Sequence, residues 1–226
     1  MPDPAESLAL YNTCILSDAV NHLGLHLSNE GFTRPGLRRL TPGGATIAGY
    51  AATARIRSSD TPITGRTYFQ HTEWWAEIDR LPRPRLVVIE DIDDTPGLGA
   101  CVGEIAAAAF RALHCAGAVT NGSCRDLAAV SAIGFDLFAA HVSPSRAYAH
   151  LVDHGSPVTI AGLLVRPGDL LVADCHGVLS LPAEHAARIC ELAADLANRK
   201  RTFVQFCASQ PFSIGAMEEH LRGLQL

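Results

Sequence analysis

The chain has 226 residues and a net charge of −5, with 48% apolar and 18% charged residues. This composition is typical of a folded globular protein and excludes a disordered one. The acidic balance and the lack of basic clusters argue against nucleic acid or an anionic membrane as a main partner.

The N-terminus carries neither a basic segment nor an apolar one, so we expect no signal peptide. No run of 18 apolar residues occurs, so we expect no membrane span. The seven cysteines are odd in number and include no Cys-x-x-Cys pair, which favours reduced thiols in a cytoplasmic protein over disulfides or a zinc knuckle. Most should be small buried side chains. Three lie beside polar turns and are weaker candidates for lining a site: Cys101, Cys124 and Cys175.

The N-terminal third predicts two short helices and then strands. Residues 5–14 predict the first helix, and Ser17-Asp18 predicts a cap for a second helix over 19–23. Residues 28–44 are rich in Gly, Pro and Arg and predict an irregular connection. Residues 45–56 predict strands, with a possible bulge at Gly49.

The next segment is aromatic and then acidic. Residues 65–81 predict a helix with one apolar face, which would place Trp74 and Trp75 in the core or at a subunit interface. Residues 85–92 predict a buried strand. The acids at its end read better as a solvated strand end than as a metal site: Glu90, Asp91, Asp93 and Asp94.

Residues 102–126 organise the rest of the chain. A glycine-acid turn at Gly103-Glu104 opens an alanine-rich helix to about Cys115, and a short strand over 118–120 leads to a turn at 121–123 and then to Arg125-Asp126. A turn, a helix, a strand and a turn bring the two polar ends to the same edge of a sheet. An anion and a divalent cation could bind there together.

The C-terminal half predicts a helix over 125–133, a strand over 135–140 and an antiparallel meander over 157–182. A long helix over 183–209 and a short one over 212–226 follow, the latter a plausible subunit contact. No repeat or linker interrupts the chain, so we expect one domain, 1–226.

Several polar side chains outside this stretch have simpler explanations than a site. His150 and His154, spaced i, i+4, could form a metal pair on a helix face, but no third ligand is evident and a hydrogen-bonded or solvent-facing pair is favoured. We expect His176 to lie in a turn. Three aspartates should serve caps and turns: Asp18, Asp169 and Asp174.

The chemistry of the stretch suits a carboxylate ligand. A helix that opens at Gly103-Glu104 presents free amides at Glu104, Ile105 and Ala106. The planar fork of Arg125 matches the two oxygens of a carboxylate. One carboxylate, from Asp126, with water and ligand oxygens is enough for Mg²⁺. The alternative is a surface ion pair between Arg125 and Asp126 at a helix start.

An acid, twenty intervening residues and Arg-Asp resembles the signature of the RraA-like proteins, which include 4-hydroxy-4-methyl-2-oxoglutarate aldolases that also decarboxylate oxaloacetate. Further matching pieces run in order along about residues 15–182: Ser17-Asp-Ala19, Leu23-Gly24, Val87-Val-Ile-Glu-Asp91, Asn121-Gly122, Val165-Arg-Pro-Gly-Asp169, Ala173-Asp174 and Gly177-Val178. The resemblance implies an α/β fold of β/β/α type, akin to a swivelling phosphohistidine domain and assembled as a homotrimer or homohexamer, with 183–226 as a C-terminal helical segment.

The resemblance also implies roles for the site residues. The backbone amides of Gly103, Glu104, Ile105 and Ala106 would bind the pyruvoyl part of a 2-keto acid, and Arg125 would hold it. Asp126 would anchor Mg²⁺ or Mn²⁺, and a carboxylate such as Glu104 would help to move the proton. A Schiff-base aldolase is disfavoured because no lysine lies in the stretch.

The sequence departs from the family pattern at two places. Glu104 stands where the best-known aldolases carry Asp, and Ala129 offers no acid one turn after Arg125. We expect a divalent-metal-dependent lyase that releases pyruvate by retro-aldol cleavage or decarboxylation. Two alternatives stay open: a non-catalytic regulator that binds a ribonuclease, as the founding member does without the Arg-Asp pair, and a lyase or hydrolase for another anionic substrate.

Overall fold

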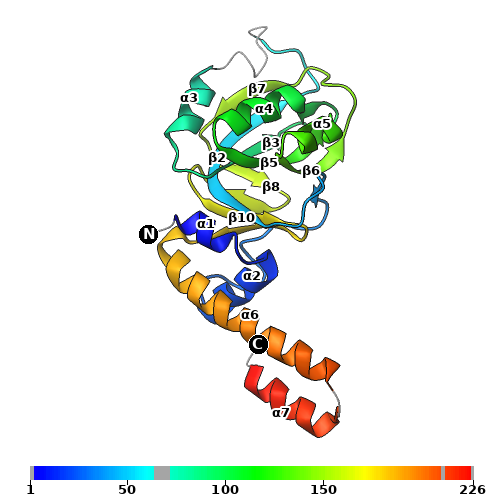
Figure 1. The fold of residues 1–226 in the computed structure, drawn as a ribbon. Helices are drawn as coiled ribbons and strands as arrows, with labels where there is room; N and C mark the ends of the chain where they lie inside the picture. Colours follow the sequence, from blue (N-terminus) through cyan, green and yellow to red (C-terminus); the bar gives the residue numbers. More distant parts are fainter. Residues whose placement is uncertain (1–2, 64–71, 210–211, 225–226) are drawn as a thin grey trace.

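The central strand of the protein is β2 (Ile47–Arg57), which pairs with other strands along both of its edges. A computed structural model describes residues 3–63, 72–209 and 212–224 (Figure 1). On one edge β2 pairs in parallel with β3 (Arg85–Asp91). On the other edge its first half pairs with β10 (Leu170–Asp174) and its second half with β7 (His150–His154), both antiparallel.

The main sheet has the order β1-β6-β5-β3-β2-β10-β11 and curls into a nearly closed barrel (Figure 1). Its remaining strands on this path are β1 (Arg38–Arg39), β5 (Cys115–Cys124), β6 (Asp136–Val142) and β11 (Gly177–Leu181). The short strand β4 (Ala100–Val102) runs parallel to the end of β5. Because β2, β3, β5 and β6 are mutually parallel, their carboxyl ends meet at one edge of the sheet.

Two layers cover the faces of this sheet. The helices α4 (Glu104–Ala112), α5 (Leu127–Ala132) and α3 (Thr72–Arg80) lie on one face around a core that contains Trp74 and Phe110, with ring centroids 5.5 Å apart. The other face packs against the hairpin of β8 (Val158–Ile160) and β9 (Leu163–Val165). Trp74 is buried and Trp75 packs against the same core, which confirms the expected core placement of both.

A second core lies where the chain ends meet β10 and β11. It joins α1 (Pro4–Leu8) and α2 (Thr13–His22) to α6 (Ala186–Ala208), which follows a short 3-10 turn, η2 (Ala183–His185). The second half of α6 projects away from the sheet and α7 (Ile214–Leu224) folds back along it (Figure 1). The predicted long and short C-terminal helices are therefore confirmed.

A buried arginine ties three segments together. Arg85 is 1% exposed at the start of β3. Its Nε donates to the carbonyl oxygen of Leu81 at 2.9 Å, and its Nη1 donates to the carbonyl oxygen of Leu113 at 2.6 Å and to Asp79 Oδ1 at 3.0 Å. The end of α3, the end of α4 and the sheet are thus joined through one side chain.

Several predicted boundaries were wrong. The second helix begins at Thr13, not at residue 19, because Asn12 Oδ1 accepts a hydrogen bond from the amide of Ile15 and caps it there. The strand predicted over 118–120 is longer in the structure, where β5 runs from Cys115 to Cys124. Residues 121–123 are therefore strand and not a turn. His150 and His154 lie on β7, so no helix face joins them.

The other helix predictions were correct in type but differ at their ends. The helix predicted over 65–81 is α3; residues 65–71 lie outside the described residues. α4 ends at Ala112, three residues before the predicted end. None of the helices among the described residues is long and apolar enough to cross a membrane.

Candidate functional site

The two polar ends of the 102–126 stretch lie together at the carboxyl edge of the sheet. β4 and β5 run parallel with Val102 beside Cys124, so both chains leave the sheet at the same point. The amide of Arg125 donates to the carbonyl oxygen of Val102 at 2.9 Å. The amide of Glu104, the first residue of α4, donates to Asp126 Oδ2 at 3.3 Å.

Arg125 and Asp126 form an ion pair at this junction. Arg125 Nε lies 3.2 Å from both carboxylate oxygens of Asp126, and the two side chains are 32% and 31% exposed. This is the surface pair that the sequence left open as an alternative. The pair uses only Nε, and Nη1 and Nη2 have no hydrogen-bond partner within residues 3–63, 72–209 and 212–224. The outer edge of the guanidinium is therefore available to a ligand.

Gly103 makes this close approach possible. A Cβ at this position would lie 2.6 Å from Asp126 Oδ2 and 2.8 Å from Arg125 Cγ, both far inside van der Waals contact. The backbone of Gly103 is extended, with φ −146°, so any residue could adopt its conformation. Space, and not conformation, requires glycine here.

The backbone of Asp126 turns its carboxylate toward α4. Asp126 adopts a left-handed conformation, φ 56° and ψ 36°, which aspartate tolerates better than most residues. Its side chain makes no capping hydrogen bond to α5, although it occupies the N-cap position of that helix. The carboxylate is therefore directed to the site and not to its own helix.

The start of α4 offers the expected backbone donors. Gly103 at the N-cap has no side chain to occupy them. The carboxylate of Asp126 accepts a hydrogen bond from the amide of Glu104. The amides of Ile105 and Ala106 have no side-chain acceptor in the described part of the chain. The side chains of Glu104 and Ile105 are exposed. These amides and the helix dipole favour an anion next to Arg125.

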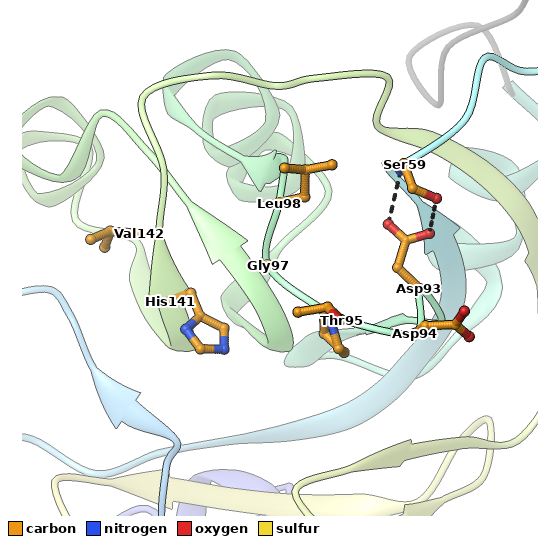
Figure 2. Close-up of a pocket in the computed structure, with 9 residues that line it drawn as sticks. Ser59, Asp93, Asp94, Thr95, Gly97, Leu98, His141 and Val142 are labelled. Carbon is orange, nitrogen blue, oxygen red and sulfur yellow. Dashed lines mark hydrogen bonds between the residues drawn. The ribbon is translucent and has the colours of Figure 1, made fainter.

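A cavity of about 350 Å³ opens beside the ion pair and is lined by Cys124, Arg125, Asp126, Leu127, Val142, Ser143 and Pro144. A second cavity of about 530 Å³ shares Val142 with it and is lined by His141, Leu98 and the loop that follows β3 (Figure 2). The sequence analysis missed Val142 to Pro144. The available signal was that Val142 ends β6, that Ser143 and Pro144 follow it, and that β6 neighbours β5 in the parallel part of the sheet.

The acids after β3 hold this loop in place. Asp93 accepts hydrogen bonds from the amides and hydroxyls of Ser58 and Ser59, at 2.7 to 2.9 Å, and Figure 2 shows its carboxylate turned toward Ser59. Although burial acts to raise the pKa of Asp93, these donors hold it below its usual value. Burial raises the pKa of Asp91, which accepts from the amides of Gly97 and Asp93. The expected solvated strand end was wrong for these two acids, because Asp91 is 2% and Asp93 is 9% exposed and their oxygens accept hydrogen bonds from backbone amides and serine hydroxyls.

The other candidate histidines and cysteines divide into structural and exposed groups. His154 Nδ1 lies 2.5 Å from Glu77 Oε2, and His150 Nδ1 lies 2.8 Å from the carbonyl oxygen of Tyr148, so both are hydrogen-bonded as expected. Burial raises the pKa of the Cys101 thiol to about 12 and that of Cys124 well above its ordinary value. Cys175, in contrast, is exposed in the turn between β10 and β11.

The donor chemistry of the ion-pair site fits Mg²⁺ or Mn²⁺. Asp126 provides one partly exposed carboxylate beside a cavity with room for water, and such cations commonly use one or two carboxylates and keep several waters. In the described part of the chain, Asp126 belongs to no group of three or more closely spaced His, Cys, Asp or Glu ligands. A closed structural metal site is therefore not formed there.

Comparison with known proteins gives the family. The family model described as "RraA-like: Aldolase/RraA" matches residues 13–180. The chain belongs to the RraA-like family. This family includes both aldolase or decarboxylase enzymes and non-catalytic regulators.

Solved structures confirm the RraA-like fold. An uncharacterised protein from Pseudomonas syringae pv. tomato has a TM-score of 0.74 at 22% identity, over 97% of this chain and 93% of that one. A Streptomyces coelicolor protein, described as an unusual member of the RNase ES inhibitor RraA protein family, has a TM-score of 0.69 at 22% identity, over 89% of this chain and 96% of that one.

A relative from Halalkalibacterium halodurans, whose name proposes a 4-hydroxy-4-methyl-2-oxoglutarate aldolase, is 30% identical over 84 residues, which are 37% of this RraA-like chain and 40% of the relative. The matched segments span 29% to 41% of the length of the curated relatives.

Proposed function

We propose that this RraA-like protein is a divalent-metal-dependent lyase that cleaves a 2-keto acid to release pyruvate. The reaction would be retro-aldol cleavage of a 4-hydroxy-4-methyl-2-oxoglutarate type of substrate, decarboxylation of oxaloacetate, or both. One observation carries the proposal: Arg125 and Asp126 line an open cavity, and Asp126 is joined to the N-terminus of α4 by the amide of Glu104. We also propose that residues 1–226 form a single domain, with its core at about 15–182, and act in the cytoplasm.

The substrate carboxylate would bind between Arg125 and the start of α4. The free Nη1 and Nη2 of Arg125 form a fork that matches two carboxylate oxygens. The amides of Ile105 and Ala106 would donate to the same group, and the helix dipole adds to this attraction. Gly103 contributes by leaving room for the Asp126 and Arg125 side chains to lie against the start of α4.

Asp126 would hold the metal ion. A bound Mg²⁺ or Mn²⁺ would supply positive charge next to the 2-keto oxygen, where negative charge develops as the C–C bond breaks. The exposed carboxylate of Glu104, at the first position of α4, would accept or return a proton through water. Lys200 ion-pairs with Asp18 between α6 and α2, away from this site, which supports a mechanism without a Schiff base.

A second copy of the chain would cover the cavity mouth. Leu98 and Val142 are 57% and 60% exposed, and both line the second cavity, which shares Val142 with the cavity beside the ion pair (Figure 2). Exposed apolar side chains beside a polar site are typical of an interface. This supports assembly as a homotrimer or homohexamer, in which a neighbouring subunit could add a further acid to the site.

Two other functions compete with this proposal. A non-catalytic regulator would bind a protein such as a ribonuclease, and a lyase or hydrolase could use the same arginine and metal on another anion. The intact Arg125-Asp126 pair favours the enzyme. A regulator that binds through its surface does not require the glycine at position 103 that lets the two side chains pack against the start of α4.

The deciding experiment is pyruvate release coupled to lactate dehydrogenase, with oxaloacetate and with 4-hydroxy-4-methyl-2-oxoglutarate, in Mg²⁺ and in EDTA. We expect metal-dependent pyruvate that is lost in Arg125→Ala and Asp126→Ala and kept in Arg111→Ala, an exposed arginine at the far end of α4. No pyruvate from folded, metal-supplied protein with either substrate would overturn the assignment. Ribonuclease binding and a screen of other anions would then separate the two competing functions.

A further inference from the structure

The second cavity, of about 530 Å³, carries polar side chains that the proposed reaction does not use. It adjoins the cavity beside the ion pair through Val142, and Figure 2 shows Thr95 between His141 and Asp94 along one side of it. Asp94, Thr95 and His141 are all exposed. Their side chains make no hydrogen bond within the described part of the chain, so their donors and acceptors are available to a ligand.

We propose that this cavity binds an uncharged, hydroxylated tail of the 2-keto acid, and that His141, Thr95 and Asp94 select such a tail over an acidic one. The inference rests on the proposed lyase function and names its substrate class, a 2-keto acid with hydroxyl groups beyond the bond that breaks. That bond is C3–C4. The C4 hydroxyl gives its proton through water to Glu104 and becomes an aldehyde oxygen, while the electron pair stays on C3, which takes up a proton to become the methyl group of pyruvate.

The ring of His141 is held in place by the loop that follows β3. A Cβ at Gly97 would lie 2.6 Å from His141 Cδ2, so carbon atoms of the ring face the glycine backbone and both ring nitrogens stay free. The backbone of Gly97 is fixed on both sides, because its amide donates to Asp91 Oδ2 at 2.8 Å and its carbonyl oxygen accepts from Ser123 Oγ at 2.6 Å. With φ 100°, this position favours glycine. The imidazole is therefore positioned before a ligand binds.

The strand register sets the length of the substrate that could reach both cavities. His141 on β6 pairs with Ser123 on β5, and Arg125 follows Ser123 by two positions. At ordinary strand spacing and rise per residue, the Cα atoms of His141 and Arg125 lie roughly 8 Å apart. A carboxylate held by Arg125 and a tail beside His141 therefore suit the two ends of one chain of about six carbons.

The charges of the cavity argue against an acidic tail. Asp93 and Asp94 both line it, and none of the described lining residues is a lysine or an arginine. Although burial acts to raise the pKa of Asp93, hydrogen bonds from Ser59 and Ser58 hold it below the ordinary value, so this carboxyl stays ionised. Arg57, whose Nε lies 3.6 Å from Asp93 Oδ1, compensates that charge. The exposed carboxylate of Asp94 would still repel a second carboxylate on the substrate.

Hydroxyl groups match all three polar side chains. A hydroxyl both donates and accepts, so it can donate to the carboxylate of Asp94 and bond to a ring nitrogen of His141 or to the hydroxyl of Thr95. Such bonds discriminate between substrates, because a site built for a hydroxyl leaves its own polar groups unpaired when an analogue lacks it. The neighbouring subunit that we place over Leu98 and Val142 would exclude water from the bound tail.

A comparison of two substrates tests the inference. The tail of 2-keto-3-deoxygluconate carries hydroxyl groups, whereas that of 4-hydroxy-4-methyl-2-oxoglutarate carries a second carboxylate, and both would release pyruvate by the same cleavage. We expect kcat/KM of the full-length protein to be at least tenfold higher for the hydroxylated substrate. His141→Ala and Thr95→Val should each lower this ratio, mainly through KM for the hydroxylated substrate. Asp94→Asn should lower it by raising kcat/KM for the acidic one. His22→Gln, at an exposed histidine on α2, is the control and should keep the ratio.

Binding without turnover separates this inference from the lyase proposal. In EDTA, titration calorimetry of the unmutated protein should give a Kd for 2-keto-3-deoxygluconate at least tenfold below that for pyruvate, and His141→Ala should remove most of the difference. Such binding without any release of pyruvate would overturn the lyase and support the tail site. Pyruvate release with a higher kcat/KM for the acidic substrate, or equal losses for both substrates in His141→Ala, would overturn the tail site and keep the lyase. Equal Kd values for the two compounds in the unmutated protein would also reject the tail site.

Discussion

Gly103 lies directly against the carboxylate of Asp126, with 2.6 Å between an added Cβ and Oδ2. Gly103→Ala should therefore push aside the Asp126 and Arg125 side chains while the extended backbone stays as it is. We expect kcat/KM for pyruvate release to fall at least tenfold, which corresponds to roughly 1.4 kcal/mol of lost transition-state stabilisation.

The matched control for this change is Gly44→Ala, because a Cβ at Gly44 meets no heavy atom within 4 Å. Urea unfolding of both variants should show similar stability. If Gly103→Ala retains full activity, Asp126 does not act from the position described here.

Arg125→Lys keeps the positive charge but removes the planar fork. Because the proposed role of Arg125 is to bind the substrate carboxylate through two parallel hydrogen bonds, we expect KM for the keto acid to rise about tenfold with a smaller change in kcat. Steady-state kinetics at saturating Mg²⁺ measures both. A fall in kcat with an unchanged KM would instead assign Arg125 to the chemical step.

Val142→Asp should weaken the oligomer. The side chain is 60% exposed at the rim shared by the two cavities, where we place a neighbouring subunit. A buried carboxylate in that contact would have to be desolvated without a partner, so sedimentation velocity should show dissociation toward smaller species. Leu10→Asp, at a side chain that is 79% exposed after α1, is the control and should sediment as the parent does. Unaltered assembly of Val142→Asp would place the interface elsewhere.

Asp93 should make part of the free energy of unfolding depend on pH. Its pKa lies below the ordinary value in the folded state, since hydrogen bonds from Ser59 and Ser58 outweigh the effect of burial. A carboxylate with a lowered folded pKa contributes fully above the unfolded pKa of about 3.9, and this contribution is lost as pH falls through the folded value. The free energy of unfolding should therefore fall from about pH 5 downward.

Asp93→Asn should remove that pH dependence and cost about 1–3 kcal/mol at pH 7, because an amide cannot accept from all four donors of Ser58 and Ser59. Urea titrations at pH 7, 5 and 3.5 measure both effects. Asp60→Asn, with a side chain that is 71% exposed, is the control. Parallel pH curves for the parent and Asp93→Asn would contradict the assigned role.

Two arginines that pair with the same carboxylate should differ sharply in their effect on stability. Asp79 Oδ1 lies 3.0 Å from Arg85, whose side chain is 2% exposed, and 3.7 Å from Arg83, whose side chain is 55% exposed. Arg85→Met should cost about 1–3 kcal/mol for each of the carbonyl oxygens of Leu81 and Leu113, since it leaves both without their donor. Arg83→Met should cost less than about 1 kcal/mol. Thermal unfolding that shifts equally in both would mean that burial of Arg85 is not what matters.

The sequence was informative about elements and less so about how they pair. Apolar runs predicted β2, β3, β10 and β11 because buried strands need such residues whatever their neighbours are. Nothing in the local pattern shows that β2 pairs with β10 and β7 along one edge, since that depends on contacts about 100 residues or more apart. The early start of α2 has a local cause in the Asn12 cap and a long-range one, because Thr13 is also held by Asp174, 161 residues away.

The candidate site was partly predictable, because some of its residues are close in the sequence and others are not. Gly103, Glu104, Arg125 and Asp126 belong to one local unit, so their meeting followed from the order of turn, helix and strand. The cavity wall at Val142 comes from β6, and its place depends on the strand order of the sheet. The roles assigned to the site residues stay predictions until the kinetic tests are made.

The left-handed backbone of Asp126 sets function against stability. An L-residue in this conformation costs roughly 1–2 kcal/mol, somewhat less for aspartate, and glycine would remove that cost. Asp126→Gly should thus fold at least as well as the parent while it lacks the proposed metal ligand. A selection for thermal robustness alone would favour loss of this carboxylate, so variants evolved for heat tolerance need an activity screen at every round.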